Sequence, residues 1–265
     1  MGDNGRSQNQ KIKRLGEIKY EKQNCPLKII EYNSAVDIIV EFQDKFKGRV
    51  HTTYRNFINL EIKNPYYPSV FEVGITGNKY PTKISGKHVA EYAAWHNIIS
   101  RSYNKKDKRK NPTYKDVTCC NEWLHYENFY EWLHRQGNFD KWLNGDKWAV
   151  DKDILNKGNK IYSPENCCLV PQNVNGLFVK NNTSRNDLPI GVIKSGTGFQ
   201  VHCSNPLTYK YENLGIYPTM TEAFLVYKKR KEEIIKLVAQ IEFDNGNITK
   251  ECYEAMTNYI VEITD

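Results

Sequence analysis

The sequence predicts an α+β protein built from small modules, and three observations carry that prediction. Short β-branched segments flank a turn near the N-terminus, at Asp37–Phe42 and Arg49–Tyr54. Apolar residues recur at helical spacing over residues 88–103 and again over residues 122–135. Three strand-like segments between residues 190 and 217 precede a strongly periodic helix. We therefore expect a small β-rich N-terminal module, a ββα-type core, and a C-terminal three-stranded sheet plus helix.

Composition and charge narrow the function classes. The chain has 265 residues, of which 38 are Lys or Arg and 31 are Asp or Glu, so its formal net charge is +7. That positive charge suits a polyanionic partner. No run approaches the ~18 apolar residues of a membrane span, and the polar start of the chain lacks the apolar stretch of a secretory signal. We therefore expect no membrane association and a cytoplasmic location, in which the seven cysteines stay reduced.

The N-terminal part divides into a tail and a module. Residues 1–24 are polar and rich in lysine, as is typical of a flexible basic tail. Residues 25–75 form the expected β-rich module, in which the segment DKFKG, ending at Gly48, makes a hairpin turn between two strands. The segment NPYYPS has the composition of a turn and ends the module.

Residues 148–178 show the order strand, loop, strand, helix. A short apolar strand ends at Asp151, and a polar loop containing glycine follows. A second strand over Cys167–Val170 then enters a helix that begins near Pro171. Upstream, the helix over residues 122–135 carries an apolar stripe typical of a core-facing surface, made of Trp123, Tyr126, Phe129, Tyr130 and Leu133.

This unit resembles the core of HNH (His-Me finger) endonucleases. The step Val150-Asp151-Lys152 stands where that family has Asp-His at the end of its first strand. The step Glu165–Pro171 matches the entry into the second strand, and Asn175 stands where the last metal ligand would fall. The resemblance covers about residues 90–180, and we assign residues 76–181 to an HNH-like domain.

The resemblance implies a metal-dependent endonuclease. Asp151 and Asn175 would hold a divalent metal, Mg²⁺ or Mn²⁺, through oxygen ligands. Such an ion stabilises the charge that develops on the leaving oxygen during phosphodiester cleavage. Asn166 would brace the loop that carries the base, which makes Asp151, Lys152, Asn166 and Asn175 the candidate catalytic residues.

Lys152 occupies the position of the family's histidine base. A lysine has an ordinary pKa near ~10.4 and does not accept a proton from water at neutral pH, although it can hold a phosphate as a point charge. Two alternatives follow: either His125 or His134 supplies the base, or the unit lacks ordinary HNH activity. Asp and Asn are also common in turns and caps, so Asp151 and Asn175 have a purely structural alternative as well.

The C-terminal part resembles the ethylene-response-factor (ERF) type of DNA-binding domain. The resemblance is carried by the steps Gly191-Val192, Gly198-Phe199 and Leu214–Phe224. We assign this domain to residues 182–241, followed by an acidic C-terminal helix over residues 242–265. The resemblance implies a sheet that docks in the major groove of DNA.

Strand alternation selects the candidate DNA contacts on that sheet. If Phe199, Val201 and Cys203 face the helix, then Gln200 and His202 face outward, and Lys194 and Lys210 are expected to join them. Ile190 and Ile193 stand where the plant family has arginines that read bases. A structural sheet-and-helix module used for protein contacts is therefore the alternative reading.

We therefore expect a phage or mobile-element DNA-binding protein with an HNH-like endonuclease core, acting in the cytoplasm of a bacterial host without a small-molecule cofactor. The alternative is a catalytically inactive HNH-like protein that binds a host defence protein or nucleic acid as an inhibitor. The adjacent pairs Cys119-Cys120 and Cys167-Cys168 have poor spacing for a zinc site and are interpreted mainly as core residues, with a structural zinc site as the alternative.

Overall fold

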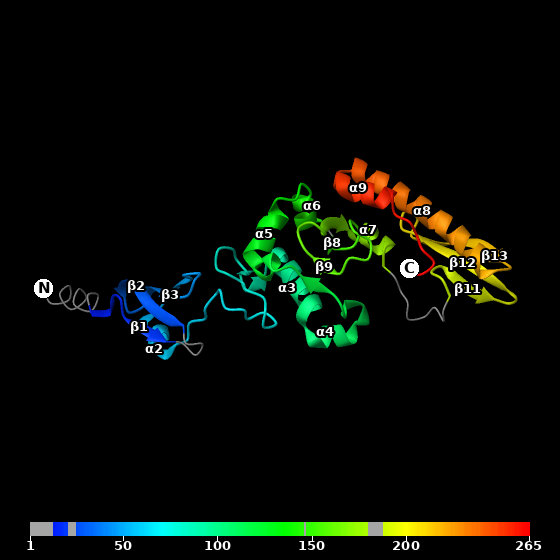
Figure 1. The fold of residues 1–265 in the computed structure, drawn as a ribbon. Helices are drawn as coiled ribbons and strands as arrows, with labels where there is room; N and C mark the ends of the chain where they lie inside the picture. The colour runs from blue at the N-terminus through cyan, green and yellow to red at the C-terminus, as the bar shows by residue number, and fades with distance from the viewer. Residues whose placement is uncertain (1–12, 21–24, 146, 180–187) are drawn as a thin grey trace. The chain divides into compact units, whose positions relative to one another are not determined.

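A computed structural model describes residues 13–20, 25–145, 147–179 and 188–265 (Figure 1). The chain forms two compact units, one made of Met1–Lys115 with Asn121–Glu131 and the other of Asp116–Cys120 with Trp132–Asp265. Both units mix helices with small sheets, which confirms the predicted α+β class. None of the described helices is long and apolar enough to cross a membrane. The residues predicted as one HNH-like domain, 76–181, fall in both units.

The first unit begins with a four-stranded antiparallel sheet in the order β1-β2-β3-β4. Its strands are β1 (Ile18–Tyr20), β2 (Pro26–Ser34), β3 (Asp37–Phe42) and β4 (Arg49–Thr52). Alternate residues of β2 and β3 are fully buried and pack against Phe57 of α2 (Tyr54–Asn59). The predicted hairpin is present, because the backbone N–H of Phe42 donates to Gly48 O at 2.9 Å. The β-rich character of this part is therefore confirmed.

The predicted flexible tail is partly wrong. Residues 1–12 and 21–24 lie outside the described residues, but Ile18–Tyr20 form the edge strand of the sheet. The backbone N–H of Gly16 donates to Ile29 O at 2.9 Å, and the guanidinium of Arg14 lies 3.8 Å from the centre of the Tyr54 ring. A polar lysine-rich segment is ordered here because an open sheet edge offers it backbone partners.

The rest of the first unit is mainly helical. It contains β5 (Lys83–Ile84), β6 (Lys87–His88), α3 (Ala90–Tyr103), α4 (Lys105–Lys110), η1 (Pro112–Tyr114), η2 (Glu122–Leu124) and the start of α5 (Tyr126–His134). Its centre is aromatic: Trp95, Trp123, Tyr126 and Phe129 are fully buried, and Trp95 Nε1 donates to Trp123 O at 2.8 Å. The apolar stripe predicted for residues 122–135 is thus a core surface.

The second unit contains the strand–loop–strand–helix order expected from the sequence. Strand β8 (Trp148–Asp151) pairs antiparallel with β10 (Cys168–Pro171), and α7 (Gln172–Leu177) follows at once. A second small sheet pairs β7 (Thr118–Cys119) in parallel with β9 (Ile161–Tyr162). Helix α6 (Phe139–Asn144) precedes β8 and packs against β10.

The C-terminal part of this unit is a three-stranded sheet covered by a long helix. Strands β11 (Val192–Ser195), β12 (Gly198–Asn205) and β13 (Lys210–Tyr217) pair in that order, and α8 (Met220–Asp244) packs against all three (Figure 1). Thr219 caps α8, and Glu222 completes a capping box. The acidic helix predicted over residues 242–265 is instead the end of α8 and a separate helix, α9 (Lys250–Thr257), because the turn Asn245-Gly246 interrupts it.

One hydrophobic core joins the two parts of the second unit. Val170 and Val174, from the β8–α7 part, belong to the same buried cluster as Val201 of β12 and Val238 of α8. The stretches predicted as an HNH-like domain and an ERF-like domain therefore contribute to the same core, although residues 180–187 separate them in the sequence.

Candidate functional site

The loop that follows β8 is organised around the Asp151 carboxylate. Asp151 is the last residue of β8, lies opposite Cys168 of β10 and is only 9% exposed. Its Oδ1 atom accepts hydrogen bonds from the backbone N–H groups of Asp153 and Ile154, both at 2.9 Å. Its Oδ2 atom accepts no hydrogen bond from any other described residue. Asp151 thus caps the loop with one oxygen and keeps the other available.

Burial gives this carboxyl group an unusual acidity. Desolvation raises the pKa of Asp151 from its ordinary value of 3.8 to about 6, and the negative charge of Asp153 adds to the rise. The two backbone hydrogen bonds act in the opposite direction. A carboxyl group with a pKa near 6 is ionised at neutral pH but ready to bind a cation or a proton.

Lys152 is turned toward a carboxylate of its own loop. Its Nζ lies 3.2 Å from Asp153 Oδ2, and its side chain is only 12% exposed. The ammonium group also lies 5.9 Å from the centre of the Tyr162 ring. Lys152 therefore forms an ion pair within its own loop.

Asn166 braces the loop through its side-chain amide. Asn156 Nδ2 donates to Asn166 Oδ1 at 2.8 Å, and Asn166 Nδ2 donates to Ser163 Oγ at 3.0 Å. A second side-chain amide also stabilises the loop, because Asn159 Nδ2 donates to Lys152 O at 2.6 Å. The contact of Asn166 with the loop is the one expected of that residue.

Asn175 lies on α7, which packs against β8. Its side chain is half-buried, and it makes no hydrogen bond with the described part of the chain. No hydrogen bond joins it to Asp151. The carboxylates of Asp151 and Asp153 are oxygen donors of the kind that suits a hard divalent cation. Across the described ranges, however, no three His, Cys, Asp or Glu side chains are arranged so that they could hold a metal ion.

The histidines proposed as substitute bases pack against aromatic rings. His125 lies in the first unit, with its ring centre 5.6 Å from that of Phe46. His134 lies in the second unit, with its ring centre 4.0 Å from that of Phe139. The pKa of Asp151 responds to Asp153 and to backbone groups, and to neither histidine.

The two adjacent pairs are arranged differently, because Cys119 and Cys120 interact with each other whereas Cys167 and Cys168 have different neighbours. Cys119 and Cys167 are buried close to Cys120, whereas Cys168 faces Cys252, with the two Sγ atoms 3.9 Å apart. All seven cysteines are reduced. Burial raises the pKa of the Cys119 and Cys167 thiols. Three of these four cysteines are therefore buried and Cys120 is half-buried, in keeping with the interpretation that the sequence favoured.

The sheet of β11–β13 presents an uncharged face to its surroundings. Gln200 lies opposite Ile193 and Ile216, which are 48% and 59% exposed, and His202 lies opposite Asn213. Residues directly opposite each other in an antiparallel pair project from the same face. Val201 and Cys203 are buried beneath α8, as the alternation predicted.

The register places Lys194 and Lys210 differently from the expectation. Lys194 lies opposite Phe199, and its Nζ is 5.1 Å from the centre of that ring. Lys210 lies opposite the buried Asn205. Both lysines therefore project from the helix-covered face, and the structure does not bring them together with Gln200 and His202.

Sequence reasoning missed Asp153, which stands two residues after Asp151. Its charge adds to the rise that burial causes in the pKa of Asp151, and its carboxylate forms the ion pair with Lys152. The signal was the spacing Asp-x-Asp at the end of a strand, since such carboxylates converge on one loop. Comparison of the chain with family models, with curated proteins and with solved structures finds no match.

Proposed function

We propose that the protein binds DNA in the cytoplasm of a bacterial host, as a phage or mobile-element protein, and that residues 148–177 form an HNH-like, metal-dependent endonuclease core. The observation that supports this most strongly is the end of β8. There a buried carboxylate, Asp151, keeps one oxygen available beside the carboxylate of Asp153. The loop, β10 and α7 follow in the order that the resemblance implies.

The residues of this loop have distinct chemical roles in the proposal. Asp151, Asp153 and Asn175 would hold a divalent ion through oxygen atoms. When bound, such an ion supplies charge stabilisation at the leaving oxygen of a phosphodiester. Lys152 attracts the phosphate electrostatically, and Asn166 keeps the loop in position.

Plasmid nicking tests the proposal. We expect the protein to nick supercoiled plasmid in Mg²⁺ or Mn²⁺, and we expect Asp151→Asn to reduce the rate at least about hundredfold. Asparagine keeps an oxygen that can accept the N–H bonds of residues 153 and 154, so this variant removes the charge and preserves the loop. Asp140→Asn, an exposed carboxylate of α6, is the matched control and should nick at the normal rate. Equal rates for the two variants, or no nicking in either metal, would exclude catalysis at Asp151.

Two observations favour the second candidate, an inactive HNH-like protein that inhibits a host defence system. Lys152 replaces the base and is held by Asp153, and Asp151 caps its own loop. Capture of proteins from a bacterial lysate after nuclease treatment tests this candidate. A stoichiometric protein partner that survives the treatment, together with no nicking, supports it; nicking that depends on Asp151 argues against it.

A further inference from the structure

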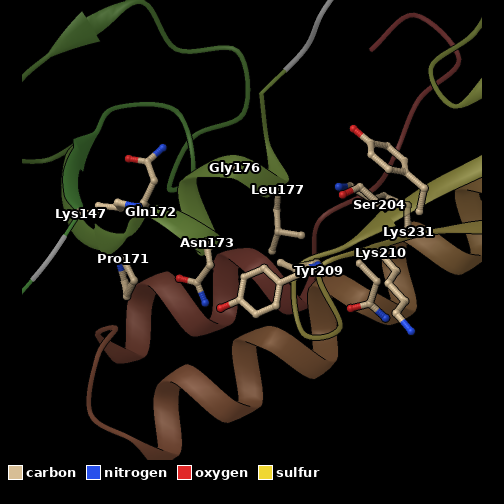
Figure 2. A pocket seen from close by; sticks show the side chains of 13 residues that line it. Lys147, Pro171, Gln172, Asn173, Gly176, Leu177, Ser204, Tyr209, Lys210 and Lys231 are labelled. Carbon is tan, nitrogen blue, oxygen red and sulfur yellow. The ribbon is translucent and has the colours of Figure 1, made fainter.

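A cavity of about 560 Å³ lies within the second unit, between α7 and the turn that joins β12 to β13 (Figure 2). Residues 171–173 and 176–177 border it on one side, residues 204–206 and 209–211 border it on the other, and α8 contributes Lys231. Its volume falls in the range of small-ligand sites, roughly 300–1,000 Å³. The Asp151 loop contributes no described residue to this cavity.

The lining is positively charged. Lys147, Lys210 and Lys231 all border the cavity, and no carboxylate is among the described residues that line it. Lys231 is the notable member, because the residue is only 8% exposed and its ammonium group makes no hydrogen bond or ion pair with any residue in the described ranges. An unpaired ammonium group is costly to bury, and burial accordingly lowers the pKa of Lys231. An anion in the cavity would relieve that cost.

The turn beside the cavity and the strand that follows it carry two exposed aromatic rings. Tyr209 is 91% exposed and Tyr211 is 80% exposed. Tyr209 also has a φ of 55°, in the left-handed region where glycine or asparagine is favoured and a bulky side chain is strained. Lys147, on the other side of the cavity, has a φ of 62°. Strained residues of this kind cluster at binding sites more often than elsewhere.

We propose that this cavity binds a nucleotide unit, with its phosphate at Lys231 and Lys210 and its base stacked on the ring of Tyr209 or Tyr211. Lysines supply the point charges that phosphate requires. An exposed tyrosine supplies a stacking surface that accepts any base. The nucleotide is either free in solution or part of a single strand, and the two sources share this chemistry. The inference does not rest on the proposed nuclease activity.

Fluorescence anisotropy measures binding to this cavity. The buffer contains EDTA, so that metal-dependent cleavage cannot occur during the measurement. The probe is a 5′-phosphorylated, fluorescein-labelled single-stranded hexanucleotide, and the competitors are dAMP, deoxyadenosine and the same hexanucleotide without the label. We expect Lys231→Met, which keeps the length and apolar stem of the side chain, to weaken binding at least about tenfold. Lys236→Met removes an exposed lysine from the same helix and should stay within about twofold.

Tyr209→Gly separates binding from folding. It removes the ring but suits the left-handed backbone, so we expect weaker binding by roughly fivefold or more together with an unchanged or higher unfolding temperature. Competition by dAMP at least as strong as that of the hexanucleotide supports the free nucleotide as the source. Much stronger competition by the strand supports nucleic acid. Absence of binding by every probe, equal effects of the two lysine variants, or competition by deoxyadenosine as strong as that by dAMP would overturn the inference.

Discussion

Asn138 is a single buried amide that ties α6 to two distant segments of the second unit. It is 5% exposed, and its Nδ2 atom donates to Leu169 O at 3.0 Å and to Asn247 O at 2.9 Å. Its own Oδ1 atom is buried without a hydrogen-bond partner in the described part of the chain. The side chain therefore satisfies two backbone carbonyls at the expense of one of its own acceptors.

We expect Asn138→Ala to lower the free energy of unfolding by roughly 2–3 kcal/mol, because two carbonyls would lose their donor. Urea denaturation followed by circular dichroism measures the loss. Asn144→Ala is the control, since Asn144 is exposed and its side chain, among the described residues, bonds only within its own helix, to Asp140 O. Equal destabilisation by the two variants would show that the buried hydrogen bonds of Asn138 contribute no more to stability than the exposed hydrogen bond of Asn144.

Cysteine accessibility gives a second prediction at this scale. Cys25 and Cys120 are half-buried, whereas the other five cysteines are buried. Because the thiolate is the reactive form, a buried thiol of raised pKa reacts slowly. We expect a thiol-reactive aromatic disulfide to label two thiols quickly in the native protein and the remainder after denaturation. Rapid native labelling of Cys168 or Cys252 would contradict the packing.

Individual side-chain directions were predicted well where one strand face is clearly apolar. Val201 and Cys203 were placed correctly because their alternation is unbroken. Lys194 and Lys210 were not, since their faces depend on which residues of β12 they oppose, and that register is set by the turns. Asp153 was overlooked because the resemblance directed attention to the adjacent Asp151 and Lys152.

Among the elements, β11 depends on a glycine at its start. Gly191 has a φ of 76°, and a Cβ atom there would lie 2.1 Å from Cδ2 of the buried Tyr227 ring on α8. A left-handed backbone and a close approach to a ring both exclude a side chain. This glycine therefore sets how closely α8 approaches the sheet.

We expect Gly191→Ala to destabilise the protein by roughly 2–4 kcal/mol, through backbone strain and overpacking together. Gly196→Ala is the matched control. It also has a left-handed φ, of 57°, but an added Cβ meets nothing within 4 Å. Thermal and urea unfolding of both variants measure the difference. Similar losses would mean that the contact with Tyr227 is unimportant.

An ion pair fastens α8 to β13. Arg230 Nε donates to Glu212 Oε2 at 2.7 Å, and Nη2 donates to Oε1 at 3.0 Å. These bonds, with a further one from Asn205, lower the pKa of Glu212 from its ordinary value of 4.5 to about 2. Because the folded state favours the ionised form, the stabilisation is complete above pH 4.5 and is lost as the pH falls toward 2.

We expect Glu212→Gln to lower stability by about 1 kcal/mol at neutral pH, a modest figure because solvent screens partly exposed pairs. The difference from the native protein should shrink as the pH falls through that window, which urea denaturation at a series of pH values measures. Glu233→Gln, which removes the more exposed partner of Arg230, should have a smaller effect. A difference that is independent of pH would contradict the assigned cause.

Most elements could be predicted from local pattern. The strands β3, β4, β8 and β12 and the capped start of α8 follow from alternation, turn residues and the Thr219–Glu222 box. Helix α4 could not be foreseen, because its sequence KKDKRK has no apolar face. Two contacts stabilise this helix. The side chain of Asn104 caps its N-terminus, and Asp107 accepts a hydrogen bond from Ser100. Strand β1 likewise depends on a partner strand and not on its own composition.

For the whole molecule, the sequence predicted local segments but not how they group into units. Periodicity reports on one segment at a time, whereas a core is defined by segments distant in sequence. Val174 and Val238 share a buried cluster, so the sheet-and-helix part and the strand–loop–strand–helix part are one unit. The choice of Asp151 and Asn166 as site residues depends on local spacing and stays a prediction. The cavity at Lys231 could not be predicted from the sequence, because it depends on tertiary packing.

The net charge of +7 gives a prediction about the intact protein. If it binds duplex DNA as proposed, lysine and arginine contacts to phosphate release counterions, and affinity must fall with salt. We expect at least about a tenfold loss between roughly 50 and 200 mM salt, measured by anisotropy with a labelled duplex in EDTA. Affinity that is insensitive to salt would exclude phosphate contacts as its main source.

The parallel pairing of β7 with β9 has a consequence for truncation. The N–H of Thr118 donates to Lys160 O and that of Cys120 to Tyr162 O, both at 2.9 Å. A shortened protein that starts at Trp132 would leave Ile161 and Tyr162 as an open edge, inviting aggregation. During synthesis, likewise, residues 118–119 leave the ribosome well before the strand that they complete. The second unit therefore finishes folding only when residues 118–119, which are synthesised long before most of that unit, pair with Ile161 and Tyr162.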